Sequence, residues 1–199
     1  MRWRRQCVSQ TVILFYPMTN QKVTSIKFKG QVYLSPAFST LKAKEIAENT
    51  STTYRDLEAA FKHYWATGYH PEFGKDAAYA RPKEILALSV RHVHHDNGDY
   101  VVSSAPEDFS ATNQCWHEWK SGTSKKRPSS DAFVVYTVTD KRDALLISYM
   151  DANAHSDSEK SEMMEDIIKV TYKFHEWKRS KPMPLDDHLS LFDDKWLED

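Results

Sequence analysis

Residues 132–150 read AFVVYTVTDKRDALLISYM, and this stretch decides the fold class of the chain. Its apolar runs, Ala132–Val138 and Leu145–Met150, are separated by the polar residues Thr139–Asp143. Runs of this length that are rich in β-branched and aromatic residues and divided by a short polar stretch are typical of a β-hairpin. We therefore predict two paired antiparallel strands here.

The sequence before this hairpin predicts three more strands. Polar and apolar residues alternate over residues 26–34 and again over Ile85–His94, as expected of half-buried strands. A short strand, Tyr100–Ser103, follows Asn97-Gly98, a dipeptide common in tight hairpin turns. The stretch Gly68–Tyr79 is rich in turn-forming residues and is predicted to be a structured loop.

Three segments have the pattern of helices. Ser39–Glu48 is rich in Ala, Lys and Glu, whereas Thr53–Ala66 carries an apolar stripe and is followed by Gly68, which is suited to end a helix. A long amphipathic helix is predicted over Asp157–Trp177. The order of elements predicts a compact α+β domain in which an antiparallel sheet packs against two N-terminal helices and a long C-terminal helix.

Composition excludes several classes of protein. The chain has 199 residues and a net charge of −1, and its low Gly and Pro content excludes a collagen-like or wholly disordered protein. Because no run of about 18 apolar residues exists, no membrane span is predicted. Two isolated cysteines, Cys7 and Cys115, fit neither a disulfide scaffold nor a zinc finger, so we expect a cytoplasmic protein.

The chain divides into three parts. Residues 1–22 are interpreted as a disordered arm or a start assigned too early, residues 23–178 as the folded domain, and residues 179–199 as an acidic tail. Residues 181–199 carry a net charge of −4, which leaves +3 on the remainder and permits RNA binding. Within the tail, His188-Leu-Ser-Leu-Phe192 resembles the short motif by which bacterial proteins dock on the replicative sliding clamp.

Histidine placement is the main chemical signal. His92 and His94 lie two residues apart on a predicted strand and therefore share a face, and His155 lies just before the long helix. Metal-independent RNA cleavage needs a base, an acid and a fixed cation, and histidines with a nearby Arg or Lys meet these needs. Arg127, together with Lys125 and Lys126, provides cations before a strand.

Structural roles remain open for the same residues. Each histidine has a structural or surface role as its alternative, because most titratable residues lie outside active sites. His92 and His94 would also suit a metal ion, but no third ligand has the right spacing. Trp116 and Trp119 fit either base stacking or ordinary packing.

An ordered series of residues runs through most of the chain. It comprises Gly68, Pro71, Phe73-Gly74-Lys75-Asp76-Ala77, Tyr79, Val90-Arg91-His92-Val93-His94, Arg127, Val135-Tyr136, Leu145-Leu146-Ile147, Ala154-His155, Met164 and Phe174. In the order and spacing of this series, the chain from about Val32 to Trp177 resembles the YafO family, the toxins of type II toxin–antitoxin modules.

The resemblance implies a small RelE-like α+β fold, ribosome-dependent endoribonuclease activity on mRNA without a cofactor or metal, and neutralisation by a cognate antitoxin. It implies catalytic roles for His92, His94, Arg127 and His155. We also expect RNA-binding roles for Lys75, Tyr79, Arg91, Lys125, Lys126 and Tyr136. The chain departs from the family pattern at Arg127-Pro-Ser-Ser130, where the run is expected to end in Asp, and in a longer insertion over residues 104–126. The alternative is a non-enzymatic binding protein on a toxin scaffold that docks on the sliding clamp.

Overall fold

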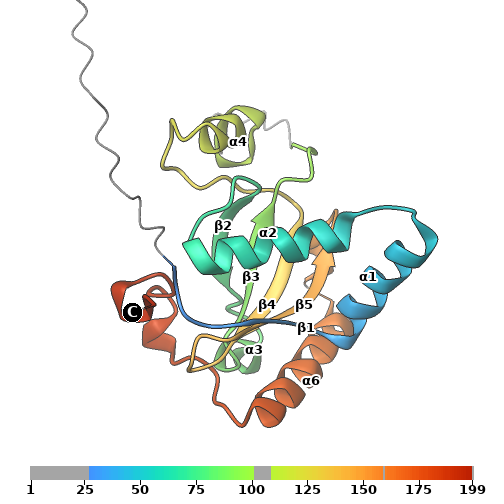
Figure 1. The fold of residues 1–199 in the computed structure, drawn as a ribbon, viewed down its shortest axis with the longest axis vertical. Helices are drawn as coiled ribbons and strands as arrows, with labels where there is room; N and C mark the ends of the chain where they lie inside the picture. Colours follow the sequence, from blue (N-terminus) through green and yellow to red (C-terminus); the bar gives the residue numbers. More distant parts are fainter. Residues whose placement is uncertain (1–26, 101–108, 159, 199) are drawn as a thin grey trace, which may run out of the picture.

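The computed structural model describes residues 27–100, 109–158 and 160–198. A five-stranded sheet with the order β1-β5-β4-β3-β2 lies between helices on both of its faces (Figure 1). Its strands are β1 (Val32–Leu34), β2 (Phe73–Ala78), β3 (Val90–His95), β4 (Phe133–Val138) and β5 (Ala144–Met150). The α+β class predicted from the sequence is confirmed.

The sheet contains the predicted hairpin but is not wholly antiparallel. β4 and β5 pair antiparallel, and β3 pairs antiparallel with β4 on its other side. β1 instead runs parallel to β5, so the predicted antiparallel arrangement is wrong at this edge. Of the strand predicted over residues 26–34, only β1 joins the sheet, while Phe28 forms an isolated bridge with Leu197.

Two elements differ from their predictions. The predicted loop Gly68–Tyr79 contains β2, an edge strand with an irregular register between Phe73 and Asp76. The predicted strand Ile85–His94 divides into a short helix, α3 (Lys83–Ala87), and β3. Residues 101–103 of the predicted strand Tyr100–Ser103 lie outside the described residues.

Helices follow the predicted order. The predicted helix over residues 39–48 begins earlier, as α1 (Pro36–Glu48), because the Ser35 hydroxyl accepts the Phe38 N–H and caps it. α2 (Thr53–Thr67) ends at Gly68, whose φ of +78° glycine adopts without strain. The long helix separates into a single turn, α5 (Ala154–Asp157), and α6 (Ser161–Lys178). None of the helices in the described ranges is both long and apolar enough to cross a membrane.

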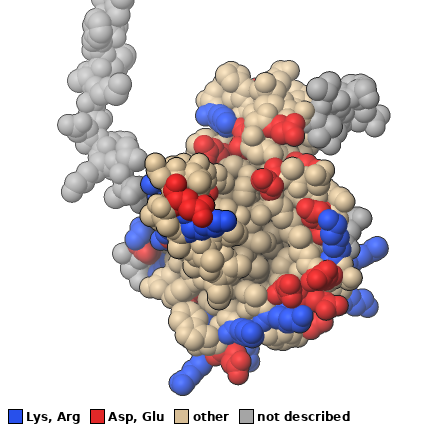
Figure 2. All heavy atoms as spheres, turned by 90° about the vertical axis from the view of Figure 1, so that its right-hand side faces the viewer, with Lys and Arg blue, Asp and Glu red and all other residues tan. Residues whose placement is uncertain are grey.

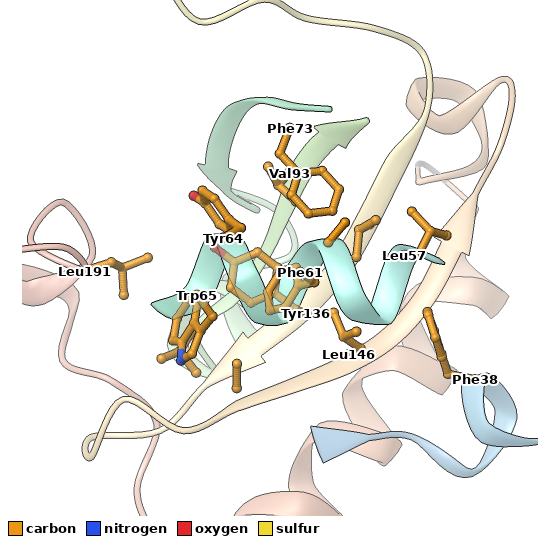
Figure 3. Close-up of a cluster of buried hydrophobic side chains, with 14 of the residues drawn as sticks. Phe38, Leu57, Phe61, Tyr64, Trp65, Phe73, Val93, Tyr136, Leu146 and Leu191 are labelled. Carbon is orange, nitrogen blue, oxygen red and sulfur yellow. The ribbon is translucent and has the colours of Figure 1, made fainter. Parts of the chain in front are cut away.

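Two apolar clusters cover the two faces of the sheet. The α2-side cluster consists of Phe38, Leu57, Ala60, Phe61, Tyr64, Trp65, Phe73, Val93, Val134, Tyr136, Val138, Ala144, Leu146, Met183 and Leu191. In it, Phe61 and Trp65 of α2 pack onto Tyr136 of β4, with ring centroids 5.0 and 5.8 Å apart (Figure 3). The α6-side cluster consists of Tyr79, Ile85, Leu88, Val90, Phe133, Val135, Leu145, Ile147, Met150, Ala154, Met164, Ile167 and Phe174.

The segment between β3 and β4 contains a further helix, α4 (Asn113–Lys120), preceded by a single 3-10 turn (Phe109–Ala111). Trp116 of this helix is buried, and its indole N–H donates to the Ser129 carbonyl oxygen at 3.0 Å. Trp119 is half-buried and packs on Tyr69 with a centroid separation of 5.0 Å. These contacts favour packing over base stacking for both tryptophans.

The residues after α6 turn back over the α2 side of the sheet and include two 3-10 turns, Leu185–Asp187 and Asp194–Trp196. The Met183 N–H donates to the Val138 carbonyl at 3.0 Å, and the Glu198 N–H donates to the Lys27 carbonyl at 2.8 Å. Leu191 is buried in the α2-side cluster. The acidic tail therefore packs against the same core as α2.

Arg142 joins both ends of the described chain to the body. It lies in the turn between β4 and β5 with a φ of +62°, and its guanidinium donates to the carbonyl oxygens of Lys29, Trp65 and Leu191. The guanidinium also lies 4.3 Å from the Trp65 ring centroid. Burial lowers the pKa of Arg142 to about 10, so the side chain stays charged at neutral pH.

Candidate functional site

Three histidines meet on the α6 side of the sheet. His92 and His94 pair with Val135 and Phe133 of β4, and Val93 between them faces the opposite side, as the alternation of a strand requires. His155 joins them from α5. The ring centroids are 5.4 Å apart for His92 and His94, and 5.9 Å apart for His94 and His155.

Phe133 is the common contact of the three imidazoles. Its ring centroid lies 4.4 Å from that of His92, 4.7 Å from that of His94 and 4.8 Å from that of His155. Because Phe133 is itself buried in the sheet, it fixes the spacing of the three rings. We refer to His92, His94 and His155 around Phe133 as the histidine cluster.

His155 is oriented by a carboxylate. Asp131 Oδ1 lies 2.7 Å from His155 Nδ1 and also accepts the His155 backbone N–H at 2.9 Å. Burial raises the pKa of Asp131, but these hydrogen bonds from His155 outweigh it and lower the pKa below its usual value. With Nδ1 engaged by Asp131, Nε2 is the nitrogen of His155 that is available for proton transfer.

His92 and His94 are neutral at neutral pH. Burial lowers the pKa of His92 to about 3, and the neighbouring His94 acts in the same direction. Burial likewise lowers the pKa of His94 to about 4. Nδ1 of His94 lies 2.8 Å from the carbonyl oxygen and 2.9 Å from the nitrogen of Ser130, which hold the ring in place.

Access differs sharply within the histidine cluster. The His155 side chain is 66% exposed, whereas His94 is only 4% exposed. Two residues predicted to bind RNA lie beside the cluster. Tyr79 packs on His92 with ring centroids 4.7 Å apart, and Lys75 is exposed on β2 and contributes to lowering the pKa of His94 after burial. The accessible edge of the cluster is therefore formed by His155.

Arg127 lies elsewhere. Its side chain lines a cavity of about 250 Å³ together with Asp76, Arg91 and residues of the tail, including His188. Asp76 faces the α2 side, where it accepts a hydrogen bond from Tyr64 at 2.6 Å. The structure therefore does not bring Arg127 into the histidine cluster, because the residues after α4 lead it to the opposite face of the sheet.

Arg91 and Tyr136, which were expected to bind RNA, are internal instead. The Arg91 guanidinium lies 3.0 Å from Asp76 and donates to the His188 carbonyl at 3.1 Å, and the Tyr136 hydroxyl donates to Asp76. Burial lowers the pKa of Arg91, but the Asp76 carboxylate outweighs this effect and raises it. Both side chains are satisfied inside the protein and are closed to a nucleic acid.

Lys125 and Lys126 are exposed on the loop after α4, and Lys126 lies over the Phe109 ring at 5.4 Å.

Sequence reasoning missed Asp131 and Phe133. The signal for Asp131 was an acid one position after the place where the family pattern expects one. In the described part of the chain, no group of three or more His, Cys, Asp or Glu residues is arranged to hold a metal ion.

Two apolar residues of the clamp-like motif, Leu191 and Phe192, pack against the folded domain. Leu191 is 3% exposed, and Phe192 packs against Tyr64 and Trp65 with ring centroids 5.0 and 5.8 Å apart. Only Leu189 of the motif's apolar residues projects into solvent, with 98% of its surface exposed. Docking through this motif would require Leu191 to leave the core.

Comparison with known proteins identifies the family. The family model described as toxin YafO of type II toxin–antitoxin systems matches residues 62–176, which is more than half of the chain and includes the whole histidine cluster. Comparisons with curated proteins and with solved structures give no match. The chain therefore belongs to the YafO family of toxins from type II toxin–antitoxin systems.

Proposed function

We propose that this toxin is a ribosome-dependent endoribonuclease that cleaves mRNA in the cytoplasm and does so without a metal ion. The observation that carries the proposal is the convergence of His92, His94 and His155 on Phe133, with Asp131 orienting the exposed member. Membership of the toxin family supports the proposal and implies a cognate antitoxin as partner.

The proposed reaction begins with removal of a proton from a ribose 2′-hydroxyl. His155 Nε2 takes up this proton, the 2′-oxygen attacks the neighbouring phosphorus to form a 2′,3′-cyclic phosphate as the bond to the 5′-oxygen breaks, and the leaving oxygen takes the proton from His155. His155 is the proton-transfer residue, because its ring is exposed and Asp131 engages Nδ1 but not Nε2. Neutral His92, which is less exposed and stacks on Phe133, is the second imidazole that the proposal involves.

A cation is needed beside the phosphate while negative charge accumulates on it. Arg127 was the expected source, but it lines the cavity on the opposite face. Lys75 takes this place in the proposal, because it is exposed and precedes Asp76 on β2, so the alternation of a strand turns it away from the α2 side that Asp76 faces. Exposed lysines elsewhere, such as Lys125 and Lys126, would add salt-sensitive attraction to ribosomal RNA.

The test compares variants of the chain on ribosome-bound mRNA. His155→Ala is expected to slow cleavage by about 100-fold or more, the usual contribution of a general acid or base. Asp131→Asn should slow it less, because it misorients the ring but does not remove it. His117→Ala is the matched control, since this histidine is exposed on α4 outside the cluster. Equal cleavage by wild type and His155→Ala would refute the assigned chemistry.

Dependence on the ribosome has its own test. Purified wild-type protein is incubated with a naked transcript and with the same transcript on ribosomes. We expect cleavage only in the second reaction. Cleavage of the naked transcript would instead favour an interferase that acts on free RNA.

A further inference from the structure

The cavity on the α2 side is a second place in the molecule where polar side chains converge. It has a volume of about 250 Å³, far more than a single water molecule needs. Its lining consists of Asp76, Arg91, Arg127, His188, Leu189, Leu191, Phe192 and Asp193. Asp76 and Arg91 satisfy each other, because their carboxylate and guanidinium lie 3.0 Å apart. The polar side chains left for a ligand are therefore those of Arg127, His188 and Asp193.

His188 has a buried ring nitrogen without a partner. The residue is only 7% exposed, and no group in the described part of the chain hydrogen-bonds its Nε2 atom. Its backbone carbonyl accepts a hydrogen bond from Arg91 at 3.1 Å, which fixes the residue at the cavity wall. A buried polar atom that lacks a hydrogen bond lowers stability unless water or a ligand supplies one. His188 therefore points to a polar group inside the cavity.

Arg127 and Asp193 bring two unpaired charges to the same cavity. On the face of the molecule drawn in Figure 2, Lys and Arg mostly lie next to Asp or Glu. Arg127 and Asp193 are exposed and line one cavity, yet in the residues that the structure describes neither has an ion-pair partner. A guanidinium offers a fork of N–H donors, and a carboxylate offers two acceptor oxygens. A ligand here would meet one pair of donors and one pair of acceptors.

Guanine is the RNA base that matches both pairs. Its O6 and N7 atoms are adjacent acceptors, which an Arg guanidinium binds bidentately. Its N1–H and exocyclic amino group are adjacent donors, which suit the two oxygens of a carboxylate. The other three RNA bases lack two adjacent donor atoms on one edge. Leu189, which is 98% exposed, adds an apolar side chain at the cavity that can cover the face of a flat ring.

We propose that this cavity binds an unpaired guanine base. Arg127 binds O6 and N7, Asp193 binds N1–H and the amino group, and His188 Nε2 adds a further hydrogen bond. The base belongs either to a single RNA strand or to a free guanine nucleotide. The proposal does not rest on the RNA-cleaving chemistry, because the cavity and the histidine cluster lie on opposite faces of the sheet.

The test is an NMR titration of the isotope-labelled full chain, which detects weak ligands and locates them. GMP, IMP and AMP are compared. GMP is expected to shift the amide signals of residues 188–193. IMP lacks the exocyclic amino group and should bind several-fold more weakly than GMP. AMP matches neither pair of groups and should bind at least about tenfold more weakly.

Variants of the exposed lining residues assign the two edges of the base. Arg127→Ala is expected to raise the Kd for GMP and for IMP at least about tenfold. Asp193→Asn should raise the Kd for GMP and remove the preference for GMP over IMP. Lys126→Ala and Asp194→Asn are the matched controls, because each removes the same charge from the adjacent residue, which does not line this cavity. Each control should change the Kd less than about twofold.

Two single-stranded oligonucleotides of equal length, one with a single guanine and one without, distinguish the two sources of the base. Tighter binding of the guanine-containing strand than of GMP would support the site and assign it to an RNA strand. Binding of GMP but of neither strand would support the site and assign it to a free nucleotide.

Three outcomes would overturn the proposal. These are equal affinities for GMP and AMP, no binding of either GMP or the guanine-containing strand, and an equal loss with Lys126→Ala and Arg127→Ala, which would reveal attraction to the phosphate alone. Guanine binding without RNA cleavage by wild type would refute only the nuclease. RNA cleavage without guanine binding would refute only this site. Thermal melts confirm that the compared variants are folded.

Discussion

His92, His94 and His95 are consecutive or nearly consecutive residues of β3, and all three are largely buried. Burial lowers the pKa from 6.5 to about 3 for His92 and to about 4 for His94 and His95. The unfolded chain therefore takes up protons near pH 6.5, where the folded chain does not. Above this pH the three rings are neutral in both states and do not reduce the free energy of unfolding. As the pH falls towards 4, the unfolded chain binds protons that the folded chain does not, so the free energy of unfolding decreases.

We predict that the free energy of unfolding falls as the pH is lowered from about 6.5 to about 4. Each of the three histidines contributes a slope of up to about 1.4 kcal/mol per pH unit. Urea unfolding at a series of pH values measures the slope, and His92→Phe should reduce it by one residue's share. A free energy of unfolding that stays constant over this range would contradict the prediction.

The sequence predicts the position of a single side chain correctly where strand geometry alone determines it. His92 and His94 share a face because side chains alternate along a strand, and this needs no knowledge of the rest of the fold. The position of Arg127 depends on the path of the chain after α4, which no local pattern specifies. Asp131 was missed for the same reason, since its role depends on where α5 begins.

At the scale of elements, the tail packs on the domain through Leu191 but not through Leu189. Leu191 enters the α2-side cluster, whereas Leu189, two residues earlier, is exposed to solvent. Leu191→Ala is expected to lower the free energy of unfolding by about 2–5 kcal/mol, the usual cost of truncating a buried leucine. Leu189→Ala should change it by less than about 0.5 kcal/mol.

Urea denaturation of the two variants makes this comparison directly. Because both changes remove the same atoms from the same motif, they differ only in burial. Equal midpoints for the two variants would mean that the tail does not pack as described. A clamp-docking role would then become tenable again.

Elements with strong internal patterns were predictable, and elements that depend on tertiary contacts were not. α2, α6 and the β4–β5 hairpin follow from apolar periodicity and from Gly68 as a helix end. From the sequence, β2 is taken for a loop because Pro71 precedes it and Gly74 lies within it. Gly74 is nevertheless required there, since a Cβ atom would lie 2.1 Å from the Pro128 carbonyl oxygen. The parallel pairing of β1 with β5 joins residues too far apart in sequence for any local pattern to reveal.

At the scale of the whole molecule, the tail is a structural part of the domain. Removing residues 181–199 would take Met183 and Leu191 out of the core and leave the Arg142 guanidinium without the Leu191 carbonyl. We predict a loss of more than about 5 kcal/mol, which is comparable to the entire stability of many domains. Thermal unfolding followed by far-UV circular dichroism should show a greatly lowered Tm.

A charge-neutralised tail serves as the control for this deletion. Replacing the exposed Asp186, Asp193 and Asp194 by Asn keeps the tail's packing and removes three of its charges. This variant should melt close to wild type. If it melts like the deletion, the acidic charge and not the packing stabilises the tail.

The contact between Arg142 and Leu191 also determines when the fold can form completely. This side chain lies in the turn between β4 and β5, but one of its three acceptors belongs to Leu191, 49 residues later in the chain. During translation Leu191 emerges after the turn, and a cation without its acceptor is costly inside a protein. The turn between β4 and β5 therefore reaches its final packing only after Leu191 has been synthesised, well after the turn itself.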